Sequence, residues 1–210
     1  MKTLGKVFIL GDSYSTFEGY IPEGYATYYS PTADYTEVNR VEDTWWHMLL
    51  RESGSQLTEN NSWSGSTVCY TGYGGYQPEQ SFVYRAERRF GKGIVHGKKT
   101  DTVIIFGGTN DFWNNSPVGE VKYSDWTDSD LRECIPAFCK ILSHIRNEAP
   151  ETEIINIVNA DMKKEIADGM EKACGFYGVK CIFLHDLDLV DGHPTVRGMK
   201  QIKEQIIEAL

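Results

Sequence analysis

The chain has 210 residues and a mass of 23.8 kDa, which predicts a single domain over residues 1–210, large enough to bury a substantial core. Its formal net charge of -9 argues against nucleic acids and anionic membranes as partners, because both attract clustered Lys and Arg. No apolar run reaches the roughly 18 residues that a membrane-spanning helix needs.

The five cysteines form no CxxC pair and have no regular spacing, which favours reduced thiols over a disulfide framework. The N-terminal region contains only a four-residue apolar run, residues 7–10, which is shorter than the apolar part of a signal peptide. With Met1 as the natural start, we therefore expect a cytoplasmic protein.

Short apolar runs alternate with amphipathic segments along the chain. Continuous apolar runs predict strands buried on both faces, and apolar spacings of three and four residues predict helices. In chain order the patterns predict a strand at 6–10, a helix over 45–51, a strand around 56–58, a helix over 80–90, a strand at 102–106, a helix over 131–145, a strand at 153–158, a helix over 162–177, a strand at 179–184 and a helix from 195 onward. This alternation predicts an α/β fold with helices on both faces of a parallel sheet.

Residue types at the ends of these segments indicate where some helices begin. Thr44 and Thr195 are expected N-caps, and Asp128 or Ser129 is expected to cap the helix over 131–145. The basic stretch over 85–99 is interrupted by Glu87 and several glycines, and it is typical of a solvated helix face.

Two segments, residues 14–40 and 62–78, are predicted to be irregular and are rich in Gly, Tyr, Ser and Thr. Loops of this length in compact domains are usually functional or disordered. Their many aromatic side chains could stack on sugar rings, line an acyl pocket, or simply pack the loops onto the body of the protein.

Polar residues follow the predicted strands at the edge where parallel sheets carry their chemistry. Ser13 ends the sequence Gly-Asp-Ser directly after the first strand, a position that suits either a nucleophile or a turn residue that caps a helix. Asn110 follows the strand at 102–106, Gly65 follows the strand around 56–58, and His193 precedes the last helix. A serine nucleophile needs a base, and His193 is the candidate.

Other polar groups in the sequence are expected to have structural rather than catalytic roles. Asp12 and Asp111 are expected to accept hydrogen bonds from turn N–H groups. His185 and Asp186 predict a surface pair, because no third ligand stands at a metal-binding spacing. The glycines over 72–75 lack the Lys-Ser/Thr of a phosphate-binding loop. We therefore expect neither a metal nor a cofactor.

Four blocks, in this order, resemble the SGNH (GDSL-like) hydrolase superfamily over nearly the whole chain. They are Gly11-Asp12-Ser13, Asn60-x-Ser62-x-x-Gly65, Gly108-x-Asn110-Asp111 and Asp191-Gly192-His193-Pro194. In the first block, Tyr14 stands where the superfamily usually has an aliphatic residue.

The resemblance implies a three-layer α/β/α sandwich with a five-stranded parallel sheet of flavodoxin-like type. It also implies an acyl-enzyme mechanism, in which Ser13 attacks the acyl carbon and His193 is its base and later the acid. The N–H groups of Ser13 and Gly65 and the Asn110 amide would form the oxyanion hole.

The superfamily usually has an aspartate three residues before the histidine, and here that residue is Val190. Asp191 and Asp188 are the nearest carboxylates in sequence, and a main-chain carbonyl could orient the ring instead. Of these we favour Asp191 as the third catalytic residue.

The sequence therefore predicts a serine esterase acting on short-chain acyl esters, with an O-acetylated carbohydrate as one candidate. A lysophospholipase or thioesterase is the catalytic alternative. A carbohydrate-binding protein that keeps the hydrolase fold without turnover is the non-catalytic one. The oligomeric state is left open.

Overall fold

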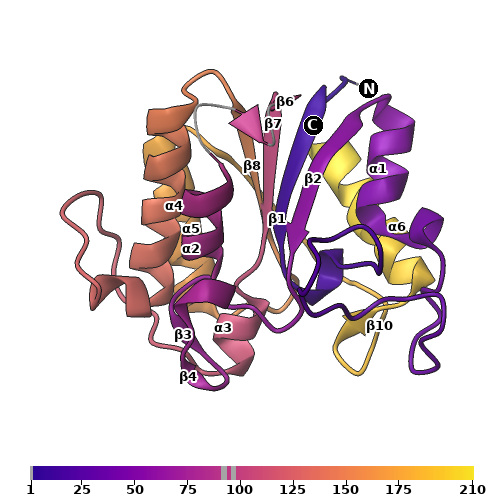
Figure 1. Cartoon of the computed structure of the whole chain (residues 1–210), viewed down its shortest axis with the longest axis horizontal. Coiled ribbons are helices and arrows are strands. Elements are labelled where there is room, and N and C mark those ends of the chain that lie inside the picture. The colour runs from indigo at the N-terminus through magenta and orange to yellow at the C-terminus, as the bar shows by residue number, and fades with distance from the viewer. Residues whose placement is uncertain (1, 91–93, 96–97) are drawn as a thin grey trace.

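Five parallel strands form the central sheet of the protein. The structure is a computed structural model that describes residues 2–90, 94–95 and 98–210. The strands are Lys6–Gly11 (β1), Gln56–Ser62 (β2), Thr102–Phe106 (β7), Glu153–Val158 (β8) and Lys180–Phe183 (β9). They lie in the order β2-β1-β7-β8-β9 (Figure 1). Counted along the chain, this is the doubly wound order 2-1-3-4-5. The predicted α/β fold with a five-stranded parallel sheet is confirmed.

Helices cover both faces of this sheet (Figure 1). One layer holds Phe82–Arg89 (α2), Cys134–Glu148 (α4) and Lys164–Tyr177 (α5), and the other holds Trp45–Ser53 (α1) and Val196–Ala209 (α6). The strands supply both layers because successive side chains point to opposite faces. Phe8 and Leu10 belong to the core under α2, α4 and α5, whereas Val7 and Ile9 belong to the core under α1 and α6.

The remaining elements are short. Thr109–Trp113 forms α3 directly after β7. Among the described residues, short antiparallel pairs join Thr71–Gly72 (β3) with Gly75–Tyr76 (β4), Ile94–Val95 (β5) with Lys98–Lys99 (β6), and Leu189–Val190 (β10) with His193–Pro194 (β11). Short 3-10 helices occupy Ser13–Ser15, Val41–Asp43, Pro78–Gln80 and Asp130–Arg132.

Two of the predicted helix caps are confirmed and one is wrong. The hydroxyls of Thr44 and Thr195 accept N–H groups at the starts of α1 and α6. In contrast, α4 begins at Cys134 after a separate 3-10 turn, and neither Asp128 nor Ser129 caps it. The Asp128 carboxylate instead binds the guanidinium of Arg132 at 2.8 Å, which removes it as a cap.

The basic stretch over 85–99 does not form a solvated helix face throughout. Arg85 is only 1% exposed, although it is a charged residue in the predicted helix. Glu87 and Arg88, on the same helix, are exposed as expected. The part of the stretch at 91–93 and 96–97 lies outside the described residues. The prediction was wrong for Arg85 because helix periodicity alone does not reveal which polar groups meet the helix in the fold.

Two further observations concern the chain as a whole. All five cysteines are free thiols, and four of them are buried. Over the described residues, no helix has the length and apolar character needed to cross a bilayer.

Candidate active site

The register of three neighbouring strands brings their following loops together. Gly11, the last residue of β1, is paired with Ser62 at the end of β2 and with Phe106 at the end of β7. The loops that carry Ser13, Gly65 and Asn110 therefore leave the sheet at one level, at its carboxyl edge. The strand order reverses here, which is where open α/β sheets bind their ligands.

Ser13 begins the 3-10 helix Ser13–Ser15 and is 3% exposed. The Asp12 carboxylate accepts the Tyr14 N–H at 3.1 Å and holds this turn, as expected. The Ser13 Oγ lies 3.0 Å from Nε2 of His193, although 180 residues separate them. The structure thus brings the expected nucleophile and base within hydrogen-bond distance.

His193 is carried by the β10–β11 hairpin, in which it pairs with Val190. The two turn residues, Asp191 and Gly192, have φ values of 48° and 76°. Positive φ at both positions is the geometry of a type I′ turn, for which Asp-Gly is a favoured sequence. The tight hairpin fixes the backbone of His193 beside the sheet.

Aromatic residues hold the His193 ring in place. The Tyr28 ring stacks on it with 3.6 Å between centroids and 6° between planes, and Trp113 meets it edge-on at 5.7 Å. The Tyr14 hydroxyl donates a hydrogen bond to the Gly192 carbonyl, so the residue after Ser13 also anchors the hairpin. The ring is therefore restrained on its face, at its edge and through its backbone.

The partner of the ring is not the predicted carboxylate. Nδ1 of His193 lies 3.2 Å from the main-chain carbonyl oxygen of Asp191, and no contact between the ring and the Asp191 carboxylate occurs among the described residues. The Asp188 carboxylate does not bind the ring either, since it accepts a hydrogen bond from the Thr195 hydroxyl at 2.5 Å. In this structure the left-handed conformation of the turn presents the Asp191 carbonyl, rather than the Asp191 side chain predicted as the third catalytic residue, to the ring.

This arrangement suits a neutral imidazole. With Nδ1 donating to the Asp191 carbonyl, Nε2 carries a free lone pair that can accept the Ser13 proton. Burial lowers the pKa of His193, while the Asp191 carbonyl and the nearby Asp191 charge oppose that shift. The neutral form that a base needs is therefore favoured.

The expected oxyanion donors are on the same edge. Gly65 lies in a turn closed by the Ser66 N–H on the Trp63 carbonyl, and its φ of 80° requires glycine, although a Cβ there would meet nothing within 4 Å. Within the described residues, the N–H groups of Ser13 and Gly65 have no acceptor. Asn110 Nδ2 donates to the Ser66 carbonyl at 3.0 Å, which leaves one of its two protons free.

Two buried carboxylates lie beneath this edge. Burial, aided by the charge of Asp111, raises the pKa of Asp12 to about 7. Asp111 is completely buried and accepts the Val68 N–H at 2.8 Å and the Cys69 N–H at 3.4 Å. Both residues thus stabilise turns, as the sequence predicted.

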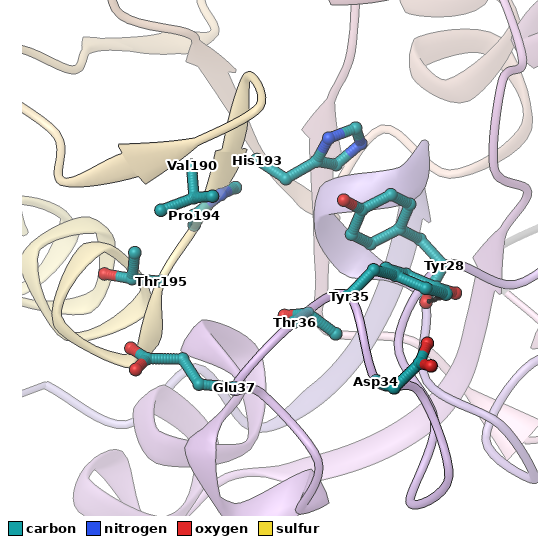
Figure 2. A pocket seen from close by; sticks show the side chains of 9 residues that line it. All are labelled: Tyr28, Asp34, Tyr35, Thr36, Glu37, Val190, His193, Pro194 and Thr195. Atoms are coloured by element: carbon teal, nitrogen blue, oxygen red, sulfur yellow. Dashed lines mark hydrogen bonds between the residues drawn. The ribbon is translucent and has the colours of Figure 1, made fainter.

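A pocket of about 370 Å³ opens beside His193 (Figure 2). Its walls are Tyr28, Asp34, Tyr35, Thr36, Glu37, Val190, His193, Pro194 and Thr195. Asp34 and Glu37 bring carboxylates to it, and no Lys or Arg is among these walls. A smaller pocket of about 140 Å³ lies against Tyr14, Thr109 and Trp113.

The aromatic residues of the two long loops are partly buried and partly exposed. Tyr14, Phe17, Tyr29 and Tyr70 are buried and pack the loops onto the body. Tyr20, Tyr35, Tyr73 and Tyr76 are exposed, and Tyr35 faces the pocket in Figure 2.

His185 and Asp186 form an exposed pair at 3.0 Å, as expected. Over the described residues, no cluster of three or more His, Cys, Asp or Glu offers ligands for a metal.

Comparison with known proteins assigns the family. The model of the GDSL-like lipase/acylhydrolase family matches residues 5–210. The chain belongs to this family. No curated protein matches the chain. The family, with the solved structures below, supports hydrolysis of ester bonds.

Two crystal structures described as GDSL-like lipases share both sequence and fold with this family member. The Bacteroides ovatus protein is 39% identical, with a TM-score of 0.91 over 99% of this chain and 98% of that chain. The Bacteroides uniformis protein is 41% identical, with a TM-score of 0.90 over 98% of this chain and 95% of that chain. A family two carbohydrate esterase from Cellvibrio japonicus is 14% identical, with a TM-score of 0.64 over 100% of this chain and 62% of that chain, and shares the fold alone.

Proposed function

We propose that this protein is a serine esterase that hydrolyses short-chain acyl esters of neutral, polyhydroxylated alcohols such as O-acetylated carbohydrates. The observation that carries the proposal is the 3.0 Å contact between Ser13 Oγ and His193 Nε2. It occurs at the carboxyl edge of the sheet, where the N–H groups of Ser13 and Gly65 have no acceptor among the residues that the structure describes.

The reaction would proceed in two halves. Ser13 Oγ attacks the acyl carbon as its proton moves to Nε2 of His193, and the negative charge on the carbonyl oxygen is met by the N–H groups of Ser13 and Gly65 and the Asn110 amide. The alcohol then leaves with the proton from Nε2, and an acyl-Ser13 ester remains. Water, deprotonated by His193, attacks this ester, releases the acid and restores Ser13.

The pocket beside His193 supports a neutral alcohol. Because His193 would deliver the proton to the leaving oxygen, we place the alcohol in the pocket that His193 lines. Tyr28 and Tyr35 offer aromatic surface for a sugar ring, and Asp34 and Glu37 can accept hydrogen bonds from hydroxyls (Figure 2). The same carboxylates repel phosphate, which disfavours a lysophospholipid or a coenzyme A thioester.

The smaller pocket supports a short acyl group. Its volume of about 140 Å³ and its position against Tyr14 and Thr109, the neighbours of Ser13 and Asn110 in sequence, suit an acetyl or similarly short chain. A carbohydrate esterase has the same fold, which is compatible with a carbohydrate ester as substrate.

The charge of the alcohol pocket gives the first prediction. The wild-type protein should hydrolyse phenyl acetate about tenfold faster, in kcat/KM, than the anionic 4-acetoxybenzoate, and the double variant Asp34→Asn/Glu37→Gln should lose most of this preference. Gln at 37 keeps an acceptor for the Val196 N–H, which Glu37 binds at 2.8 Å. Asp186→Asn, an exposed carboxylate outside the pocket, is the control. Equal rates on both esters in wild type would contradict the assignment of the pocket.

The Asp191 carbonyl gives the second prediction. Asp191→Asn keeps the main-chain carbonyl on Nδ1, so we expect kcat to change by no more than about threefold. Loss of the nearby negative charge should lower the pKa of His193, because the Asp191 charge raises it. Since the neutral ring is the active form, the acidic limb of the pH profile should then move to lower pH. A steep loss of kcat at all pH values would instead restore the carboxylate to the triad.

The missing carboxylate is also the observation that favours the non-catalytic alternative, a carbohydrate-binding protein. Incubation with an aryl acetate separates the two functions. Release of phenol that requires both Ser13 and His193 supports the esterase. Binding of sugar without any such release would support the alternative.

A further inference from the structure

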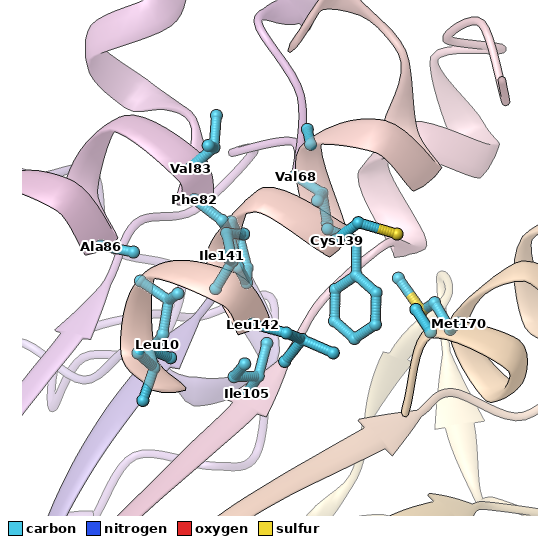
Figure 3. Close-up of a cluster of buried hydrophobic side chains, with 14 of the residues drawn as sticks. Leu10, Val68, Phe82, Val83, Ala86, Ile105, Cys139, Ile141, Leu142 and Met170 are labelled. Carbon is cyan, nitrogen blue, oxygen red and sulfur yellow. The ribbon is translucent and has the colours of Figure 1, made fainter. Parts of the chain in front are cut away.

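The guanidinium of Arg85 is buried next to the two loops that form the proposed oxyanion hole. The helix α2 directs Phe82, Val83 and Ala86 into the core (Figure 3), and Arg85 is buried on the same helix at 1% exposure. Its guanidinium donates five hydrogen bonds. Nε donates to the Gln80 carbonyl at 2.9 Å, and Nη1 donates to the Asn61 carbonyl and to Oδ1 of Asn61 at 2.9 Å. Nη2 donates to the Gly11 carbonyl at 3.1 Å and to the Ser66 hydroxyl at 2.9 Å. All the donors of the guanidinium are thus used.

Two of these acceptors, on Gly11 and Ser66, belong to the turns that carry Ser13 and Gly65. The Gly11 carbonyl is two residues before Ser13 and also accepts the Trp63 N–H at 3.1 Å. Ser66 directly follows Gly65, and its hydroxyl donates to the Trp63 carbonyl at 2.7 Å. The Ser66 carbonyl accepts the Asn110 amide. One side chain therefore connects the nucleophile turn, the Gly65 turn and, through Ser66, the Asn110 side chain.

The five acceptors of Arg85 carry no charge, so its positive charge is not cancelled by its hydrogen bonds. Burial lowers the pKa of Arg85 to about 10, against the opposing influence of Tyr25, Asp12 and Glu59. The group therefore remains cationic at neutral pH. A cation in a region of low dielectric stabilises negative charge that develops nearby.

We propose that Arg85 is a positioning residue for ester hydrolysis, fixing the Ser13 and Gly65 turns so that their N–H groups and the Asn110 amide meet the oxyanion together. The inference rests on the proposed esterase function. Because the oxyanion exists only in the transition state, loss of this positioning should lower kcat and leave KM nearly unchanged.

Arg146 provides a matched control. Its guanidinium also binds main-chain carbonyls, those of Tyr177 at 3.0 Å, Thr152 at 2.8 Å and Gly178 at 2.9 Å. Thr152 immediately precedes β8, so this cluster is at the amino edge of the sheet, opposite the site. Loss of either arginine should lower the thermal stability, but only loss of Arg85 should affect the oxyanion.

The experiment compares Arg85→Lys with Arg146→Lys on an aryl acetate. We expect Arg85→Lys to lower kcat by roughly 10- to 100-fold with KM within about twofold, and Arg146→Lys to keep kcat within about twofold. A boronic acid, which forms an anionic tetrahedral adduct with the serine, should bind Arg85→Lys more weakly by about the factor lost in kcat/KM. An effect confined to KM, or equal kcat losses in the two variants, would overturn the inference.

If Arg85→Lys fails to fold, the variant Ser66→Ala tests whether Arg85 positions the two turns. It removes one acceptor of the guanidinium and leaves the charge in place, and we expect kcat to fall by about three- to tenfold with KM unchanged. An unchanged kcat in this variant would overturn the positioning role. Wild-type protein without activity on any acetate ester would refute the proposed function itself, before Arg85 enters the comparison.

Discussion

Ser13→Ala should abolish hydrolysis of aryl acetates, with kcat reduced by about 10⁴-fold or more, while the melting temperature stays close to that of wild type. The alanine lacks the Oγ that lies 3.0 Å from His193 Nε2, so no acyl-enzyme can form. An organophosphate should label Ser13 in the wild-type protein and should not label the variant, which peptide mass spectrometry would show.

Ser15→Ala is the matched control for this experiment. Ser15 belongs to the same 3-10 turn, and its hydroxyl is fully buried without a hydrogen-bond partner among the described residues. Its removal should leave kcat within about twofold of wild type. Retention of more than about 1% of wild-type activity by Ser13→Ala would exclude Ser13 as the nucleophile.

Asn110→Ala should lower kcat by roughly 10²–10³-fold with little change in KM, because the free proton of its amide would bind the oxyanion only as the charge develops. Asn110→Asp should be at least as damaging, since it places a carboxylate where negative charge forms. Asn114→Ala, at the end of the same short helix, is the control, because Asn114 binds the Ser116 hydroxyl at 3.0 Å and the Thr71 carbonyl at 3.4 Å. A change in KM alone would make Asn110 a group that binds the substrate in its ground state.

Much of the fold could be predicted because its signals are local. The apolar runs over 102–106 and 153–158 are buried on both faces, so they read as strands of a parallel sheet without reference to the rest of the chain. The positions of Ser13 and Asn110 followed from the same signals, since each lies just beyond a strand end. The register of β1 with its two neighbours then places them at one edge.

The orientation of His193 was predictable only in part. Asp191-Gly192, with Leu189-Val190 before it and His193-Pro194 after it, is a known signal for a two-residue hairpin turn. That signal would have shown that both turn residues have positive φ, and hence that a side chain two residues away need not face the ring. The spacing of the carboxylates alone does not show whether the turn presents a side chain or a main-chain carbonyl to the ring.

The role of Arg85 had no comparable signal in the sequence. Its acceptors are 5, 19, 24 and 74 residues away along the chain, and most of them are main-chain carbonyls, which every residue possesses. Periodicity places Arg85 on a helix, but the strand ends that satisfy its guanidinium are brought there only by the assembled sheet. Tyr28, which stacks on His193, escaped prediction for the same reason.

The hydrogen bond from Tyr14 to the Gly192 carbonyl links two departures from the superfamily pattern. In the first block, Tyr14 replaces an aliphatic residue, and in the last block Val190 replaces the aspartate that would orient the histidine. An aliphatic side chain at 14 could not donate this bond, whereas Tyr14 ties the hairpin of His193 directly to the turn of Ser13. Where the superfamily pattern has a carboxylate, His193 in this structure is held by three uncharged groups: the phenol of Tyr14 through the hairpin, the stacked ring of Tyr28 and the peptide carbonyl of Asp191.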